Sequence, residues 1–446
     1  MKKQFFYAAL AIGMMSSCSS NDLPGNQQPE NPEDERVAIE LGVSPLNTVV
    51  STRGTGYVGN KEGGTTAEWA GQTLGIFMAE KGTLTKAKDI DGTYFFEGLT
   101  FTAPTTGNSG TVKNNLGAVK YYPLTGAFDF YGWHLDDAEG ADAINADNLT
   151  GTITINGTQD LMVGKAAVTE DQKTNFNADI NENFTMDNAI ARAYSSWTAR
   201  RGVQPIIKFK HLLARLDFKA CLGQNLGDAN DKIAVTKTRE NKTYEEAYKL
   251  DQGYPQPESG EIKNGVYVKS IKVIDPVTTF DVTVAAIDEN TLGISHPQDA
   301  TEDGSTSFEL KQKSTTPGNV MEKLIPVNAG ITKNDDGKDV GDGIMIVPGS
   351  NKFKMKVVLM QYVKVIDKND ATDPTDIEDI YEWKENEMTT EVALPEGTFG
   401  AGNYYTVKIT MFGFQKIEVH AELAAWQSGG EPITSNPEDE NFTTGQ

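Results

Sequence analysis

The sequence predicts an all-β fold of two β-sandwich domains in tandem, with short helical insertions between strands. Short β-rich runs alternate with clusters of Gly, Asn, Asp and Pro along most of the chain, and this pattern is typical of sandwich domains. Several runs alternate apolar and polar residues, so that one face of each strand points to a core. A chain of 446 residues is long enough to bury two such cores.

The first 18 residues have the pattern of an export signal that ends in a cysteine. Lys2 and Lys3 precede an apolar run over 5–15, and Ser16 and Ser17 then lead to Cys18. The run has the length of a signal peptide and not of a transmembrane helix. This arrangement resembles a bacterial lipobox, although Met15 stands where Leu is usual. We therefore predict a signal peptide over 1–18 with lipidation at Cys18; an ordinary secretory signal is the alternative.

Next in the chain come a tether and a candidate first strand. Residues 19–36 are polar, acidic and rich in proline, which predicts a disordered segment. Over 37–43 every second residue is apolar, which is the pattern of a strand with one buried face. The buried residues would be Val37, Ile39, Leu41 and Val43. A turn-rich loop that contains Arg53 follows, and exposed loops of this kind are favoured sites of proteolysis.

The remaining strands follow in order, with two helical insertions. Helices are expected over 184–200 and 244–250. The strand pattern is clearest over 73–78, 127–135, 151–157, 205–220, 267–274, 279–287, 352–366, 404–412 and 415–426. The break near Val203 divides the chain into an N-terminal sandwich domain over 37–203 and a C-terminal one over 204–446.

The composition excludes some classes of function. A formal net charge of −23 and few clustered cations argue against nucleic-acid binding. Cys18 and Cys221 are the two cysteines, so a lipidated Cys18 leaves Cys221 without a partner within the chain and the fold depends on packing instead of disulfides. We expect Cys221 to behave as a small hydrophobic residue.

No sequence motif indicates an enzyme, a cofactor or a metal site. The four histidines form no HExxH or HxH motif, and there is no GxSxG motif or phosphate-binding glycine loop. The acidic loops over 334–343 and 367–379 do not match the twelve-residue EF-hand pattern. We expect Trp69, Trp133 and Trp426 to anchor cores, with an aromatic sugar-binding platform as the alternative.

Several segments together resemble the fimbrillin family, the subunits of type V pili of Bacteroidales-type bacteria. The resemblance covers most of the chain and lies in the order of its parts, none of which is specific alone. The parts are Cys18, VAIELGV at 37–43, Thr52-Arg53, Trp69, GQTLGIFM at 71–78, YYPLTGAFDFYGW at 121–133, FKHLLARLDF at 209–218, IMIVPGSNKFKMKVVL at 344–359 and the final strand pair over 399–426.

The resemblance implies two transthyretin-like sandwich domains and assembly by strand exchange. Family subunits are exported as lipoproteins to the outer membrane, and an arginine-specific protease then cuts the loop after the first strand. Here that loop contains Arg53. Cleavage at Arg36, the alternative, would leave the first strand attached to the domain. Loss of the first strand opens a groove that a strand from another pilus subunit can fill.

The resemblance leaves the position in a pilus open. Residues 427–446 are polar and lack alternating apolar residues, so they form a weak donor strand and favour a tip or accessory subunit that contributes to adhesion. The expected locations are the cell outer membrane, for the precursor, and the extracellular fimbrium. The rival hypothesis is a monomeric outer-membrane surface lipoprotein that binds glycans or nutrients.

Overall fold

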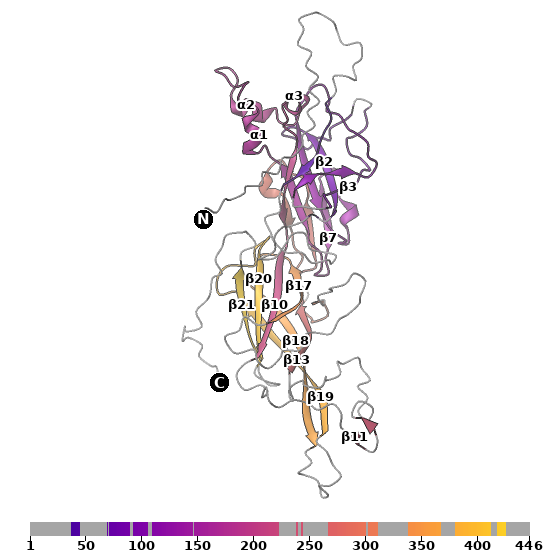
Figure 1. Cartoon of the computed structure of the whole chain (residues 1–446), viewed down its shortest axis with the longest axis vertical. Helices are drawn as coiled ribbons and strands as arrows, with labels where there is room; N and C mark the ends of the chain where they lie inside the picture. The colour runs from indigo at the N-terminus through magenta and orange to yellow at the C-terminus, as the bar shows by residue number, and fades with distance from the viewer. Residues whose placement is uncertain are drawn as a thin grey trace, which may run out of the picture. The chain divides into compact units, whose positions relative to one another are not determined.

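The computed structural model describes residues 37–44, 69, 71–89, 92–105, 109–145, 147–222, 238–239, 242–243, 266–299, 302–310, 338–366, 380–411 and 417–424. Strands account for 42% of the structure and helices for 9%. The predicted all-β, sandwich-type fold is therefore confirmed (Figure 1). Within the described ranges, no helix is both long enough and apolar enough to cross a membrane.

The largest sheet in the described part of the chain has eight strands, in the order β4-β1-β9-β8-β6-β2-β3-β5. This order differs from the order of the sequence, because the first strand β1 pairs with β4 and β9, both of which come later in the chain. The strands of this sheet are β1 (Gly42–Val43), β2 (Thr73–Glu80), β3 (Phe101–Thr102), β4 (Gly110–Thr111), β5 (Lys113–Asn114), β6 (Phe128–His134), β8 (Met162–Ala166) and β9 (Ile206–His211).

The middle of this sheet is buried on both faces. In β2, Leu74, Ile76 and Met78 belong to one core, while Phe77 and Ala79 belong to another. Successive strand residues point to opposite faces, so the alternation places one core on each side of the sheet. We call the core that contains Leu74, Ile76 and Met78 the N-terminal core. It also contains Leu41, Val43, Trp69, Tyr122, Phe130, Phe176, Tyr194 and Ile207.

A three-stranded sheet contributes to the other core. It has the order β15-β14-β7 and consists of β7 (Thr150–Thr154), β14 (Thr279–Thr283) and β15 (Gly293–Ser295). Ile153 of β7 lies opposite Phe280 of β14, and both side chains are buried in the same core as Phe77. This sheet thus joins segments from both sides of Val203. The division of the chain into domains at that residue stays a prediction.

From residue 214 onward, the described strands other than β14 and β15 form two four-stranded sheets and one two-stranded sheet. One sheet has the order β17-β10-β20-β21 and the other β16-β13-β18-β19, while β11 pairs with β12. Their bounds are β10 (Ala214–Leu222), β11 (Thr238–Arg239), β12 (Lys242–Thr243), β13 (Val266–Ile274), β16 (Ser307–Glu309), β17 (Lys338–Ile346), β18 (Lys352–Ile366), β19 (Ile380–Ala393), β20 (Tyr404–Met411) and β21 (Ile417–Ala424).

Each predicted run corresponds to a described strand, with one run divided, whereas other strands, among them β8 and β19, had no predicted run. The predicted strand over 352–366 is β18 with the same bounds. The run over 205–220 is two strands, β9 and β10, which belong to different sheets and are separated by Leu212 and Leu213. Both leucines are buried, so an apolar pattern alone does not reveal where the chain passes between sheets. The run over 279–287 is also shorter than predicted, because β14 ends at Thr283.

The predicted helix over 184–200 is wrong in detail, because it is two short helices. Tyr194 has a left-handed backbone conformation with φ 61°, which interrupts a right-handed helix. The Ser195 side chain then caps the next helix. The helices are α1 (Glu170–Thr174), α2 (Met186–Ala191) and α3 (Ser196–Ala199), with 3-10 turns over Ala141–Ala143 and Glu289–Thr291. The helix expected over 244–250 lies outside the described residues.

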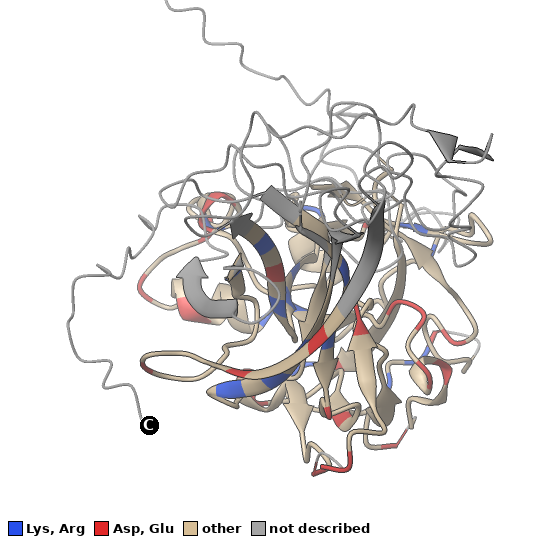
Figure 2. Cartoon of the chain, turned by 90° about the horizontal axis from the view of Figure 1, so that it is seen from below, with Lys and Arg blue, Asp and Glu red and all other residues tan. Residues whose placement is uncertain are grey.

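Charged residues of both signs occur along the described strands (Figure 2). On β18, Lys352 lies 3.0 Å from Glu391 and Lys356 lies 2.6 Å from Glu387, both across to β19. These pairs are largely exposed, so each is expected to add about 1 kcal/mol or less to stability. Cross-strand pairs of this kind help to fix the register of two long strands.

Candidate functional site

The first segment of the described chain, residues 37–44, contains the short interior strand β1 of the large sheet and an isolated bridge at Ala38. On one side it runs antiparallel to the chain over 110–122, with Gly42 opposite Thr111. On the other side it runs parallel to β9, with Gly42 opposite Ile206. Both neighbours are later parts of the chain, so the segment fills a slot between them. We call the space between residues 110–122 and β9 the first-strand slot.

Backbone hydrogen bonds hold the segment on both sides. Towards 110–122, the N–H of Ile39 donates to Lys120 O at 2.8 Å, and the N–H of Val112 donates to Leu41 O at 2.8 Å. Towards β9, the N–H of Gly42 donates to the carbonyl of Pro205 at 3.0 Å. Loss of the segment would leave these partner groups of the slot without their bonds, which is costly where they are buried.

The four apolar side chains of the segment all contact the N-terminal core, to different depths. Leu41 is 5% exposed and Val43 is 2% exposed, whereas Val37 and Ile39 are half-buried and pack against the same core. All four side chains lie on the face that the alternation of apolar and polar residues over 37–43 predicts to be buried. Burial of the two deepest side chains stabilises the segment by about 3 to 6 kcal/mol before ordering costs.

The side-chain amide of Gln204 also bonds the backbone of the segment. Its Nε2 donates to Ala38 O at 3.1 Å, and its Oε1 accepts from the N–H of Glu40 at 3.3 Å. These two partners fix which end of the amide is oxygen, because a carbonyl requires a donor and an N–H requires an acceptor. Gln204 lies two residues before the start of β9, next to Pro205.

Two further residues hold Gln204 in place. The hydroxyl of Tyr122 donates to Gln204 Oε1 at 3.3 Å. The amide of Gln172, in α1, donates to the backbone carbonyl of Gln204 at 2.7 Å. Gln172 is itself fixed by a capping box with Thr169 at the start of α1. The amide that contacts the first segment is therefore oriented by groups from two other parts of the fold.

Burial raises the pKa of Tyr122 well above its ordinary value, with a smaller contribution from Tyr194. Burial likewise raises the pKa of Tyr131 and Tyr194, and for both the nearby Asp129 carboxylate adds to the shift. The Tyr122 hydroxyl therefore remains a hydrogen-bond donor throughout the physiological range.

These raised pKa values predict a loss of stability at alkaline pH. Tyr122 is more acidic in the unfolded chain, so its contribution is complete below pH of about 10 and falls as pH rises towards its folded pKa. We expect phenolate absorbance at 295 nm to show tyrosines that ionise only together with unfolding. Tyr122→Phe should lower by one the number of tyrosines that ionise only with unfolding. An unchanged number would contradict the raised pKa of Tyr122.

Trp69 contacts the end of the first segment. It is completely buried, and its indole Nε1 donates to Ser44 O at 3.4 Å. Its ring packs edge-to-face on Phe209 of β9, with ring centroids 5.0 Å apart. Trp69 thus lies in the core, as the sequence indicates, and it contacts both the segment and one wall of the slot.

Cys18 and Arg53, the predicted lipidation and processing residues, lie outside the described residues. The structure brings together Val37, Ile39, Leu41 and Val43, and it adds Gln204, Tyr122 and Trp69 to the candidate site. Sequence reasoning missed the roles of Gln204 and Tyr122. The one available signal was a glutamine before a proline at the start of a strand, where the proline has no N–H to continue a ladder.

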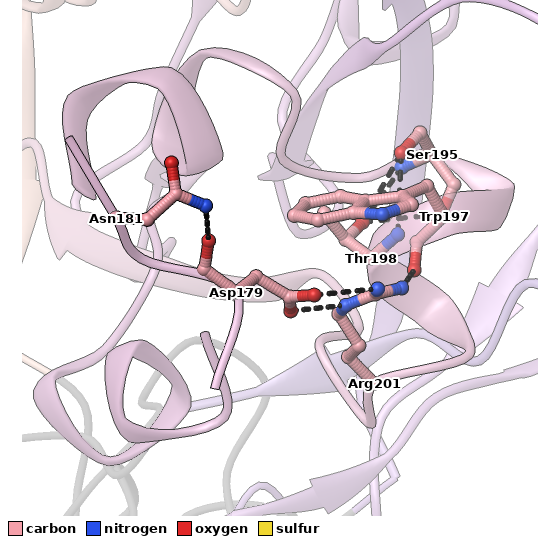
Figure 3. Close-up of polar contacts among 6 residues, drawn as sticks. All are labelled: Asp179, Asn181, Ser195, Trp197, Thr198 and Arg201. Carbon is pink, nitrogen blue, oxygen red and sulfur yellow. Dashed lines mark hydrogen bonds and ion pairs between the residues drawn. The ribbon is translucent and has the colours of Figure 1, made fainter. Parts of the chain in front are cut away.

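A second cluster of polar and aromatic side chains surrounds α3 (Figure 3). Arg201 binds Asp179 through two hydrogen bonds of 2.6 and 2.9 Å, and this contact lowers the pKa of Asp179. The guanidinium lies 4.1 Å from the ring centre of Trp197, and Phe176 stacks on the same indole at 5.7 Å. Trp197 is thus packed by its neighbours, which disfavours it as a sugar-binding platform.

The described residues contain no group of three or more His, Cys, Asp or Glu side chains placed to hold a metal ion. The features of the site are an interior strand, a buried apolar face and polar groups that bond the backbone. They define a β-sandwich-type protein whose first strand is held through contacts with later parts of its chain.

The family comparison agrees with this class. The family model described as fimbrillin-like matches residues 64–320. The chain belongs to the fimbrillin-like family, and the resemblance seen in the sequence is confirmed. A search of curated protein sequences finds no match.

Several solved structures resemble the chain at low sequence identity. A candidate cell adhesion protein from Bacteroides uniformis is 14% identical, with a TM-score of 0.42, over 89% of this chain and 100% of that one. A fimbrial protein from Bacteroides vulgatus is 17% identical, with a TM-score of 0.42, over 88% and 100%. The tip fimbrial protein Mfa3 from Porphyromonas gingivalis is 9% identical, with a TM-score of 0.34, over 87% and 100%. Family membership rests on the family model.

Proposed function

We propose that this protein is a structural subunit of a surface fimbrium, assembled by exchange of its first strand. The observation that carries the proposal is the position of residues 37–44 inside a sheet, between two later parts of the chain. A chain cut after this segment would keep both walls of the slot. A strand from another subunit could then fill the slot through backbone hydrogen bonds and apolar contacts.

The proposed pathway begins with export and lipidation at Cys18, which tethers the precursor to the outer membrane. An arginine-specific protease then cuts after Arg53 and releases residues 37–44 together with the tether. Cleavage at Arg36 would leave those residues covalently joined to the domain, so it would not open the slot. The mature protein would start at Gly54 and belong to the extracellular fimbrium.

The energetics support exchange in place of an empty slot. Leu41 and Val43 are nearly fully buried, so an unfilled slot would expose the apolar surface that covers them. Backbone groups at Lys120, Val112 and Pro205 would also lose their partners. An empty slot of this kind is a template for strand addition. Residues 427–446 lack alternating apolar residues, which favours a tip or accessory position with a role in adhesion.

The N-terminus of assembled protein tests this function. Protein recovered from sheared surface filaments should start at Gly54 by mass spectrometry, and Arg53→Ala should leave the precursor lipidated and unassembled. Arg36→Ala is the matched control, which should assemble as wild type does. An assembled fraction that still carries an acylated Cys18 would exclude processing at Arg53. An unprocessed monomer with saturable glycan binding would support the rival surface lipoprotein instead.

A further inference from the structure

We propose that the Gln204 side chain hydrogen-bonds to the backbone of whichever strand fills the first-strand slot, and that these bonds fix the direction and register of that strand. The inference rests on the proposed exchange of the first strand and adds a positioning residue and a description of the incoming strand. It follows from the pattern of hydrogen bonds that the Gln204 amide makes.

The amide of Gln204 reproduces one step of a parallel β-ladder. In a parallel pair, one residue donates to the carbonyl before its partner and accepts from the N–H after it. Gln204 Nε2 donates to Ala38 O and Oε1 accepts from Glu40 N–H, so the two bonds bracket Ile39. The backbone bond from Gly42 N–H to Pro205 O continues the same parallel ladder into β9.

A side chain is needed at this point because the backbone of the wall cannot continue the ladder. Pro205 has no N–H to donate. The Gln204 amide supplies a donor and an acceptor just before the proline, and Gln172 holds the backbone of Gln204 from the other side. The first strand is thereby bonded over more of its length than β9 alone would allow.

These bonds involve backbone groups of the strand and none of its side chains. Gln204 would therefore hold any strand with suitable spacing, including one from another subunit. Which side chains the slot accepts depends instead on the positions of Leu41 and Val43, because these are the buried residues of the segment. The incoming strand should carry apolar residues two and four positions after the residue that Gln204 brackets.

The orientation of the amide also makes the contact directional. A strand running the opposite way would present its N–H and C=O groups to Gln204 in the reverse order. The amide would have to turn over and present Nε2 to the Tyr122 hydroxyl, whose own O–H would then lose Oε1 as its acceptor. The slot should therefore favour strands that run parallel to β9 and antiparallel to residues 110–122.

Peptide exchange tests the inference, with the complete precursor first cleaved by an arginine-specific protease. The probes are an isotope-labelled peptide with the sequence of residues 36–45 and a peptide with the same residues in reverse order, both followed by native mass spectrometry. In wild type, the forward peptide should be retained about tenfold longer than the reversed one. Gln204→Met, which keeps the length of the side chain, should speed release of the forward peptide about tenfold, as expected for two lost hydrogen bonds, and should reduce the preference for direction.

Two variants keep the result interpretable. Gln159→Met is the matched control, because Gln159 is a buried glutamine whose Oε1 accepts from Asn156 N–H within its own turn; it should release the peptide as wild type does. Tyr122→Phe removes one hydroxyl and should weaken the preference for direction even if Gln204→Met folds poorly. Equal retention of both peptides by wild type, or equal release from wild type and Gln204→Met, would overturn the role of Gln204. If neither wild type nor any variant takes up either peptide, the proposed exchange of the first strand would be overturned instead.

Discussion

Leu41→Asp is expected to destabilise the N-terminal core by about 4 kcal/mol or more and to loosen the first segment from its slot. Leu41 is 5% exposed and belongs to the N-terminal core. The substitution removes buried apolar surface and places a carboxylate in an apolar core. Urea unfolding followed by tryptophan fluorescence should show the loss of stability.

A neighbouring exposed residue provides the control for Leu41. Glu40→Gln changes a side chain on the opposite face of the same strand, where the residue is exposed, so stability should change by about 0.5 kcal/mol or less. After cleavage by an arginine-specific protease, residues 37–44 should likewise be released faster from Leu41→Asp than from Glu40→Gln. If Leu41→Asp and Glu40→Gln unfold at the same urea concentration, the burial of the first segment in the core is incorrect.

Gly75→Val should be at least as damaging, by a different mechanism. A Cβ at Gly75 would lie 2.0 Å from Cε2 of Trp133, on the neighbouring strand β6. The indole must move to admit even one methyl group, and it packs against the core that contains Phe77. Overpacking of this size is expected to cost about 3 kcal/mol or more, measured by denaturant unfolding.

A double-mutant cycle isolates this clash. Gly75→Ala should cost much less in a Trp133→Ala background than in wild type, with a coupling energy of about 1 to 3 kcal/mol. Gly42→Ala is the control, because the nearest atom to its Cβ would be 3.5 Å away, an ordinary contact. Equal costs of Gly75→Ala in both backgrounds would show that Trp133 does not occupy the space over Gly75.

Local patterns predicted the strands well because each pattern depends on residues close in sequence. The β-rich run over 352–366 gives β18 with the same bounds, whereas β8 and β19 had no predicted run. The single helix over 184–200 was wrong because Tyr194, whose buried ring packs edge-to-face on Phe130, adopts a left-handed conformation. Periodicity carries no information about such a conformation.

The candidate site was only partly predictable for the same reason. The alternation over 37–43 identified which side chains face the core, but it gave no indication that Leu41 and Val43 would be deeper than Val37 and Ile39. That difference depends on what covers each position. Gln204 was missed because its contact with Ala38 joins residues 166 positions apart, and a lone glutamine in a sequence is usually an exposed polar residue.

The sequence by itself therefore determined the all-β class, the positions of many strands, the face of the first strand and the resemblance to the fimbrillin family. Only the tertiary structure showed that this strand lies inside a sheet, parallel to β9 and antiparallel to residues 110–122, with the Gln204 amide completing the ladder beside Pro205. The physical reason is that side-chain alternation specifies a buried face, whereas strand neighbours are chosen by hydrogen bonds and packing between segments far apart in the chain.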